Sequence, residues 1–509
     1  MASAAAAAGC QTVERVDASS SGHASGDAPF SLGVASGDPT AESVILWTRV
    51  APTPFAAPID ETIDVAWEVA TDDAMRQVIA SGIAAARPEL AHCVHIEATR
   101  LAPDRHYYYR FQALGRSSPI GRTRTLPSPG TRTDEFRIAM SSCMEYTQGY
   151  FTAFRDLHKQ QPNLVLHNGD YIYESSSGDV RSYPIAWEAT RLSDYRALYA
   201  QYRQDADLRE AHRQFPWIVI WDDHEVSNDF GPNHFLPSRY NAPMSVSDHR
   251  KRVLVGRQAF LEHMPLRASL SLHDNGTPIM YRQDVVGDLL ELNRLDVRSF
   301  RDTPVCIQDD ELEFHRCPAI DDPSRSMLGA AQEAWLMSSF GTSGNVWNCL
   351  AQTTMMAPFD REAGPAVVHE AESWDNYAAN RTRFIEHIRN RGIRNPVSLG
   401  GNIHAYYAGT VSERAADGSC PNPAMTEIVT TSVSAGGGGN GRYDDVHGRQ
   451  DENPCIEFFE NRHRGYTLLT FTQEELRAEF RVVDQTRTPD GTVESLRTLV
   501  VNDGVLGCS

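Results

Sequence analysis

The stretch that most constrains the fold is PWIVIWDDHE, at residues 216–225. Its mostly apolar first part runs directly into Asp222, Asp223, His224 and Glu225, with no spacer between them. A continuous apolar run of this kind is typical of a strand buried on both faces, as in a parallel sheet. Charged groups at its end are costly to remove from water unless they are paired or bind metal. Taken alone, the tetrad fits an ordinary salt-bridged strand end as well as a functional site.

Three further apolar segments end in a similar way. They are residues 135–142, followed by Cys143; residues 163–168, followed by GDYIYE at 169–174; and residues 395–400, followed by GNIH at 401–404. In open α/β sheets, ligands bind at the carboxyl ends of the strands. Four strands that each deliver a thiol, carboxylate, phenol, amide or imidazole therefore predict one shared site.

Together with Ser142-Cys143, these blocks resemble the signature motifs of the PhoD-like alkaline phosphatase/phosphodiesterase family. This branch of the metallophosphoesterases also includes some bacterial enzymes with phospholipase D activity. The resemblance extends over most of the chain and implies an α/β fold. It implies a metallophosphoesterase-type core of two mixed sheets between helices, preceded by an immunoglobulin-like β-sandwich domain. The implied activity is metal-dependent hydrolysis of phosphoric esters, by metal-activated hydroxide at a binuclear or multinuclear site.

The composition changes twice along the chain, which at 509 residues is long enough for two domains. Residues 1–29 are rich in Ala, Ser and Gly and are expected to be disordered. Residues 30–127 contain short alternating strands separated by turn signals, which predicts a β-sandwich. Residues 135–509 alternate apolar strands with helical patterns, which predicts a layered α/β catalytic domain. The expected strands and helices are 44–50, 63–69, 93–98 and 107–112 in the sandwich, and helical segments at 150–157, 331–336 and 380–389 in the core.

The polar residues after the strands divide into two sets of metal ligands. Asp170 is the best candidate for a carboxylate shared by two cations, because Gly169 lets the backbone turn sharply before it. A phenolate from Tyr173 binds only a strongly Lewis-acidic ion, which favours ferric iron, and the Cys143 thiolate also suits a transition metal. His404 would complete that site.

A second site can be built from the oxygen ligands of Asp170, Asp223 and Asn402, which suit calcium or magnesium. Matched residue by residue, the resemblance implies the same division, with Fe³⁺ at the first site and Ca²⁺ at the second. Mg²⁺, Mn²⁺ and Zn²⁺ are alternatives for the second cation. The family more often has Asp where this chain has Asn402, which removes one negative charge and keeps an oxygen ligand. Asp222 and Asn228 are additional candidate ligands.

The resemblance implies that His224 faces the substrate and assists the leaving group, so that His224, Asp170 and Asp223 are the expected catalytic residues. A neighbouring Asp or Glu225 could orient the imidazole. A phosphate clamp also needs an arginine. The candidates are Arg181, Arg196, Arg203, Arg298 and Arg301, each of which is by default a salt-bridged surface residue.

The net charge and the cysteine content indicate which partners and which compartment to expect. A net charge of −20 argues against specific nucleic-acid binding, so the expected partner is a small phosphate mono- or diester. No apolar run approaches the roughly 20 residues of a membrane span. Nine cysteines are compatible with two or three disulfides in an exported protein, periplasmic, cell-surface or extracellular. Cys306–Cys317 is the favoured pair, Cys420 with Cys455 or Cys508 is the next, and Cys10 is a candidate lipid-attachment site.

Two alternatives to a general phosphoric ester hydrolase stay open at this point. One is a phospholipase D-type phosphodiesterase, which uses the same chemistry on a different ester. The other is a non-catalytic, calcium-binding surface protein, which Asn402 alone favours. The glycine-rich segment 434–440 either borders the cleft or forms a plain surface loop.

Overall fold

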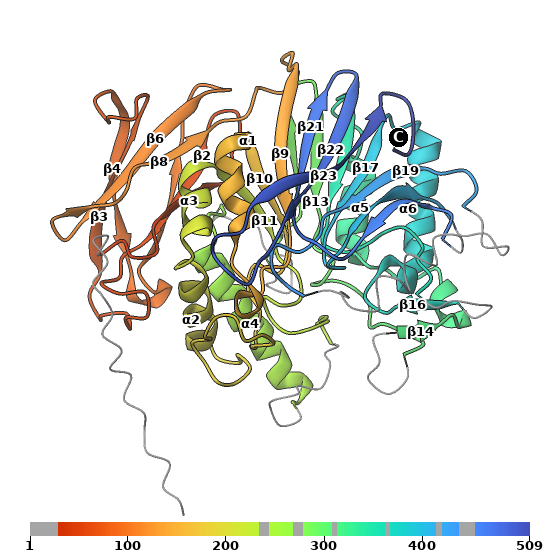
Figure 1. Cartoon of the computed structure of the whole chain (residues 1–509), viewed down its shortest axis with the longest axis horizontal. Coiled ribbons are helices and arrows are strands. Elements are labelled where there is room, and N and C mark those ends of the chain that lie inside the picture. Colours follow the sequence, from red (N-terminus) through yellow and green to blue (C-terminus); the bar gives the residue numbers. More distant parts are fainter. Residues whose placement is uncertain are drawn as a thin grey trace, which may run out of the picture.

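The computed structural model describes residues 29–233, 244–267, 278–307, 313–361, 367–413, 420–436 and 453–508 (Figure 1). The predicted disorder of residues 1–29 and the lipid-attachment site at Cys10 therefore lie outside the described residues, apart from Pro29. None of the described helices is both long and apolar enough to cross a membrane.

The larger central sheet has nine strands. They are β1 (Val34–Gly37), β2 (Val44–Arg49), β5 (Cys93–Ala98), β9 (Glu135–Ser141), β10 (Leu164–Asn168), β11 (Pro216–Ile220), β21 (Arg464–Thr472), β22 (Glu475–Val483) and β23 (Val493–Asn502). Their order is β23-β22-β21-β9-β10-β11-β1-β2-β5. The central strands β9, β10, β11 and β1 are parallel, and the strands on either side are antiparallel. The carboxyl ends of β9, β10 and β11 therefore lie at the same edge.

The second central sheet has seven strands and the same plan. They are β12 (Arg282–Val286), β13 (Leu290–Arg294), β15 (Trp347–Ala351), β17 (Pro396–Gly400), β18 (Tyr406–Val411), β19 (Met425–Val429) and β20 (Ile456–Glu460). Their order is β12-β13-β15-β17-β19-β18-β20, with β13, β15, β17 and β19 parallel. The strands β15, β17 and β19 are buried along their whole length, which explains the continuous apolar runs in the sequence.

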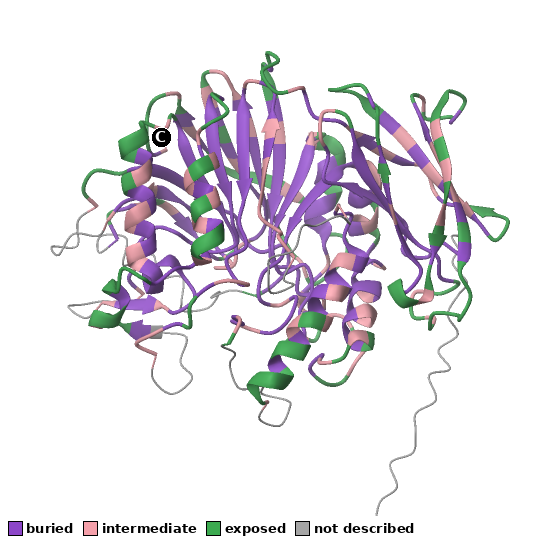
Figure 2. Ribbon diagram, turned by 180° about the vertical axis from the view of Figure 1, so that it is seen from behind, coloured by how far each residue is buried: buried purple, intermediate pink, exposed green. Residues whose placement is uncertain are grey.

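The two sheets pack face to face and helices cover their outer faces. Residues such as Met140 and Trp347 fill the layer between the sheets. The outer face of the nine-stranded sheet is covered by α2 (Leu192–Tyr202), α3 (Ala206–Gln214) and α4 (Val246–His263), and that of the seven-stranded sheet by α5 (Gly329–Ser339) and α6 (Ala378–Arg391). Figure 2 shows the buried residues concentrated in the sheets and on the inward sides of the helices. The predicted fold class, two sheets between helices, is confirmed.

Most of the predicted helices are confirmed. Segments 331–336 and 380–389 lie within α5 and α6. Segment 150–157 is instead a short 3-10 helix, η3 (Thr152–Asp156), that leads into the single-turn α1 (Leu157–Gln160). The remaining 3-10 helices are η1 (Pro88–Leu90), η2 (Tyr146–Gln148), η4 (Pro318–Asp321) and η5 (Trp374–Tyr377).

The N-terminal β-sandwich is confirmed, but one of its two sheets is shared with the core. The separate sheet contains β3 (Ile63–Ala70), β4 (Val78–Ala86), β6 (His106–Ala113), β7 (Arg116–Ser117) and β8 (Gly121–Arg124). It packs on β1, β2 and β5, which are the edge of the nine-stranded sheet. Because β1 pairs in parallel with β11, the sandwich continues directly into the central layer. The division into domains at residues 127 and 135 stays a prediction.

Two disulfides join segments outside the parallel strands of the second sheet. Cys306–Cys317, the favoured pair, closes the segment before η4, where β14 (Glu313–His315) pairs with β16 (Val368–Glu370). Cys420 pairs with Cys455, the first of its two predicted partners, and this bond ties the segment before β19 to the start of β20. Cys508 is half-buried and free.

Candidate metal centre

The predicted ligands lie at the edge where strands from both sheets end. Cys143 follows β9, Asp170 follows β10 and Asp223 follows β11, whereas Asn402 and His404 follow β17 of the other sheet. The two edges are joined by hydrogen bonds. Asn168 donates its side-chain amide to the Leu399 carbonyl at 3.1 Å, and the Asn402 backbone N–H donates to Ser142 Oγ at 3.3 Å. The convergence of segments separated by more than 250 residues follows from this contact between the sheets.

Two glycines allow the backbones to approach this closely. Gly169 has φ +82°, and a Cβ there would lie 2.3 Å from Asp222 Cβ. A Cβ at Gly401 would lie 2.5 Å from Ser142 Oγ. Any other residue would push the strand ends apart.

The backbone is strained at the ligands themselves. Cys143, Asp170, Asn402 and His404 have φ of +57°, +55°, +66° and +52°. This left-handed region is uncommon for residues other than glycine, although Asn, Asp and His enter it more readily than Cys. Sparsely populated backbone conformations cost about 1–3 kcal/mol each and cluster at functional sites. Four of the six predicted ligands share this feature. The direction in which these side chains point is therefore maintained at a cost in local backbone stability.

The ligand atoms of the first site converge closely. One ligand atom from each of Cys143, Asp170 and His404 lies within 4.8 Å of the other two. The Tyr173 hydroxyl donates to Asp170 Oδ2 at 3.1 Å and lies 3.1 Å from His404 Nε2. The four residues that the sequence assigned to the iron-type site are therefore brought together around one point.

Burial explains why this cluster fits a cation. Desolvation, together with the neighbouring Asp170 carboxylate, raises the pKa of both Cys143 and Tyr173 well above their usual values. Desolvation also raises the pKa of Asp170 well above its usual value, and lowers the pKa of His404 to about 3. Without a compensating positive charge, the acids would keep their protons and the imidazole would stay neutral. A thiol, a phenol, a carboxyl group and a neutral imidazole are the donor set that a transition-metal cation deprotonates and binds.

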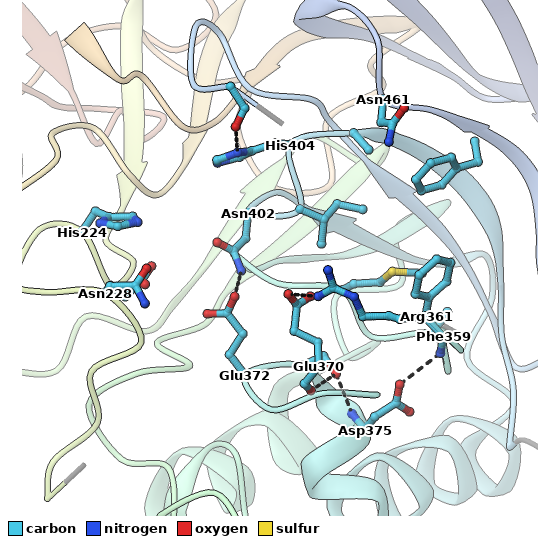
Figure 3. Close-up of a pocket in the computed structure, with 18 residues that line it drawn as sticks. His224, Asn228, Phe359, Arg361, Glu370, Glu372, Asp375, Asn402, His404 and Asn461 are labelled. Carbon is cyan, nitrogen blue, oxygen red and sulfur yellow. Dashed lines mark hydrogen bonds and ion pairs between the residues drawn. The ribbon is translucent and has the colours of Figure 1, made fainter. Parts of the chain in front are cut away.

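The second predicted site shares Asp170 with the first. Ligand atoms of Asp170, Asp223 and His224 lie within 4.8 Å of one another. The Asn402 side-chain amide donates to Glu372 Oε1 at 2.9 Å, which leaves its oxygen as the ligand atom (Figure 3). The carboxylates of Asp170 and Asp223 and the amide oxygen of Asn402 suit a hard cation such as calcium, and the His224 imidazole lies beside the two carboxylates. Glu372 has no role in the sequence analysis, since only the folded chain shows that it orients Asn402.

The two additional candidate ligands differ in position. Asn228 lines the pocket beside His224. Asp222 instead accepts from Arg298 Nε at 2.5 Å and Nη2 at 3.0 Å, and from Thr353 Oγ1 at 2.6 Å. Both carboxylate oxygens of Asp222 therefore already accept hydrogen bonds from Arg298 or Thr353.

His224 is oriented by Glu174 rather than by a neighbour in its own motif. Its Nδ1 lies 2.6 Å from Glu174 Oε2, and its ring stacks on Tyr173 with centroids 4.1 Å apart. Desolvation alone would lower the pKa of His224, but Glu174, Asp223 and Asp170 raise it well above its usual value. Glu225 has a different function.

Glu225 holds the strand ends together. Its carboxylate accepts from the backbone N–H groups of Asp170, Tyr171 and Asp222, at 3.2, 2.6 and 2.7 Å. The acidic side chain therefore satisfies backbone donors that would otherwise be buried without partners.

Arg298 is the centre of a buried charge network. In addition to Asp222, it donates to Glu372 at 2.8 Å, to Asp229 at 3.1 Å and to Asp223 at 3.4 Å. The other candidate phosphate clamps are also occupied elsewhere. Arg301 pairs with Asp229, Arg181 with Asp205 and Arg196 with Glu262, and Arg203 is buried over the Trp47 ring. None of the five is among the described residues that line the pocket, so the expected clamp is not found in this set.

Three of the six predicted ligands, Asp223, Asn402 and His404, open onto a pocket of about 440 Å³. Asp223, His224, Asn402 and His404 are among the residues that line it, and Figure 3 labels the last three. Gly436, in the described part of the glycine-rich segment, also lines the pocket, and its carbonyl lies 2.8 Å from His404 Nδ1. The described part of this segment therefore borders the cleft at Gly436, which fits the first of its two interpretations.

Comparisons with known proteins agree with this geometry. Residues 138–480 match the model of the PhoD-like phosphatase family, and residues 16–127 match that of the PhoD-like phosphatase N-terminal domain. The chain is 38% identical to alkaline phosphatase D of Bacillus subtilis (strain 168) over 484 residues, which are 93% of this chain and 80% of that protein. It is also similar to a solved structure described as the structure of PhoD, with a TM-score of 0.86, 37% identity, and coverage of 94% of this chain and 91% of that chain.

Proposed function

The chain belongs to the PhoD-like phosphatase family and is a phosphoric ester hydrolase homologous to alkaline phosphatase D, and from this premise we propose that it hydrolyses phosphate mono- and diesters at a centre of at least two cations. The observation that carries the proposal is the convergence of Cys143, Asp170 and His404, whose ligand atoms lie within 4.8 Å of one another. The Tyr173 hydroxyl lies within 3.1 Å of two of them. A buried cluster of this composition is unusual unless it binds metal.

The donors differ enough to assign two cations. Cys143, Asp170, Tyr173 and His404 suit Fe³⁺, and Asp170, Asp223 and Asn402 suit Ca²⁺, with Mg²⁺, Mn²⁺ or Zn²⁺ as alternatives at the second position. When bound, such cations generate a nucleophile from water at neutral pH and neutralise the oxygens of the transferring phosphoryl group. Because this chain has Asn402 where the family more often has Asp, its second site carries one negative charge less.

The remaining steps belong to side chains of the chain itself. His224 is held by Glu174 and by the Tyr173 ring and faces the pocket, so it is positioned to give a proton to the departing alkoxide oxygen. Glu372 accepts from the Asn402 amide nitrogen, which leaves the amide oxygen available to the second cation. Glu225 fixes the backbone before Asp170 and thus the direction of that carboxylate.

Two further points of the proposal concern location and alternatives. The two disulfides support export to an oxidising compartment, such as the periplasm, the cell surface or the medium. A phospholipase D-type activity would use the same centre, so a phospholipid is assayed beside a simple monoester and diester. The non-catalytic calcium-binding alternative is not retained, since the family is one of hydrolases.

The metal assignment is tested on protein from its native source, by metal analysis and visible absorption. We predict that Tyr173→Phe loses the charge-transfer colour of a phenolate bound to ferric iron, because the ligand oxygen is gone. Tyr171→Phe is the matched control, since that hydroxyl lies 2.9 Å from His212 Nε2 in the core and its variant should keep the band. An unchanged spectrum in Tyr173→Phe would count against this ligand. Hydrolysis of p-nitrophenyl phosphate and bis(p-nitrophenyl) phosphate is measured on the same samples.

A further inference from the structure

The pocket beside the candidate metal centre extends into an apolar compartment. Met355, Phe359, Ile403 and Phe459 line the pocket and belong to one hydrophobic cluster, and Figure 3 labels Phe359 among them. The rings of Phe359 and Phe459 are nearly parallel, with an interplanar angle of 14° and centroids 6.1 Å apart. Side chains of this kind bind neutral organic groups rather than phosphate oxygens.

The charged groups around the compartment are already paired. Arg361 forms an ion pair with Glu370, and among the described residues that line the pocket it is the one lysine or arginine. Asp375 pairs with Arg381 at 2.8 Å and with His369 at 3.1 Å. A charged substrate arm would therefore meet compensated charges and lose its hydration, whereas a neutral arm would lose little.

The two phenylalanines are held in place by the fold. Phe459 lies in β20, is only 6% exposed, and pairs with Tyr407 of β18. Phe359 lies between β15 and β16, and its backbone N–H donates to Asp375 Oδ2 at 3.0 Å. A wall that is preformed loses little conformational entropy when a ligand binds.

The position of the compartment selects which part of a substrate it contacts. In Figure 3, His224 and Phe359 lie on opposite sides of the view, with Asn402 and Glu372 between them. The group that departs beside His224 is therefore not the group that reaches Phe359. A monoester has no second organic arm, so only a diester can occupy both parts of the pocket.

We propose that this compartment is a binding subsite for the non-leaving arm of a phosphodiester, and that the arm is neutral and aromatic or otherwise apolar. The inference rests on the proposed function, because it needs a phosphoryl group bound at the metal ligands. It makes the phosphodiester with an apolar arm the preferred substrate class.

Four substrates with the same leaving group test this inference. They are p-nitrophenyl phosphate and its methyl, phenyl and 4-carboxyphenyl diesters, and release of p-nitrophenolate gives kcat/KM for each. The wild-type holoenzyme should prefer the phenyl over the methyl diester by about tenfold, which corresponds to burial of one aromatic ring. It should disfavour the carboxyphenyl diester. Since a phenyl arm also changes intrinsic reactivity, the change in this preference between wild type and variants is the deciding quantity.

Phe359→Ala and Phe459→Ala should each reduce the phenyl preference to about twofold and leave the monoester rate within about twofold. Phe458→Ala is the matched control. This neighbour in β20 packs against Phe480, with ring centroids 5.1 Å apart, on the side of the core between the sheets. Its variant loses an aromatic pair of similar size but should keep the phenyl preference. Phe459→Leu, which preserves apolar volume and removes the ring, replaces Phe459→Ala if that variant does not fold.

The possible results distinguish a failure of the proposed function from a failure of the apolar subsite. If the wild type hydrolyses none of the four esters with its metals bound, the proposed function is wrong. If it hydrolyses them with no preference for the phenyl arm, or prefers the carboxyphenyl arm, only the apolar subsite is wrong. An equal loss on all four substrates in the phenylalanine variants would also overturn the subsite, because it would reveal a general structural effect.

Discussion

Replacing Arg298 by methionine should strongly destabilise the protein, because this guanidinium is the shared counter-charge of several buried carboxylates. Its side chain is fully buried and contacts Asp222, Asp223, Asp229 and Glu372 at distances of 2.5–3.4 Å. Methionine keeps much of the volume but leaves these acids without their cation. Breaking one buried ion pair by removing a partner costs about 3–5 kcal/mol. We expect the free energy of unfolding to fall by at least this amount, since several carboxylates lose the same partner.

The assay is urea denaturation of metal-depleted protein at neutral pH, in which bound cations cannot compensate for the missing charge. Arg389→Met is the control. That arginine forms a solvent-exposed pair with Glu413 at 3.3 Å, and exposed pairs contribute about 0–1 kcal/mol. If Arg298→Met destabilises the protein no more than Arg389→Met, the network does not stabilise the site. A large loss that metal addition partly restores would link the network to the centre.

Three further changes have defined outcomes. Asp170→Ala should abolish phosphoester hydrolysis, because it removes the carboxylate shared by both proposed cations, and turnover within about tenfold of wild type would refute that assignment. Glu174→Gln should lower kcat by about 10–100-fold with unchanged metal content, since the imidazole of His224 loses the carboxylate that holds it; an unchanged kcat would contradict its orienting role. Burial raises the pKa of Glu427 from 4.5 to about 7, so the folded state holds this proton more tightly than the unfolded chain. The free energy of unfolding should therefore fall by about 3 kcal/mol between pH 4.5 and pH 7, and urea titrations across this range should show a flatter profile for Glu427→Gln.

Local sequence patterns predicted the parts of the site that depend on a single strand. Apolar runs identified the strands that precede Cys143, Asp170, Asp223 and Asn402, and a polar residue after a buried strand lies at the sheet edge by geometry. The resemblance to a family then grouped residues that the structure brings close together, such as Cys143, Asp170 and His404, and their role as ligands stays a prediction. Gly169 was also interpretable, because a sharp turn before a ligand requires a positive φ.

Contacts between distant segments could not be predicted in the same way. Glu174, rather than the adjacent Glu225, contacts His224, because the turn after Tyr173 brings it back against the imidazole. Arg298 was one of five candidate phosphate clamps among which the sequence could not choose, and it is surrounded by carboxylates of the chain itself. The pairing of β1 with β11 was equally hidden, since a strand sequence does not specify its neighbour.

The strained backbone at the candidate ligands connects stability with function. If the four positive-φ ligands cost about 1–3 kcal/mol each, their sum is comparable with the whole free energy of unfolding of a typical domain, about 5–15 kcal/mol. Asp170, Asn402 and His404 belong to residue types that tolerate this region, so Cys143 carries the largest share. Such a conformation persists only where surrounding contacts determine it. Here β9 and the bridge between Ser142 and Ser432 hold the backbone before the thiol. After it, the Met144 N–H donates to the Asp170 carbonyl at 2.9 Å, and the thiol is buried against Tyr173 and Ala435. The two-sheet core is therefore what allows a strained thiol, a phenol and an imidazole to share one point, and a bound cation would remove the remaining reason for them to separate.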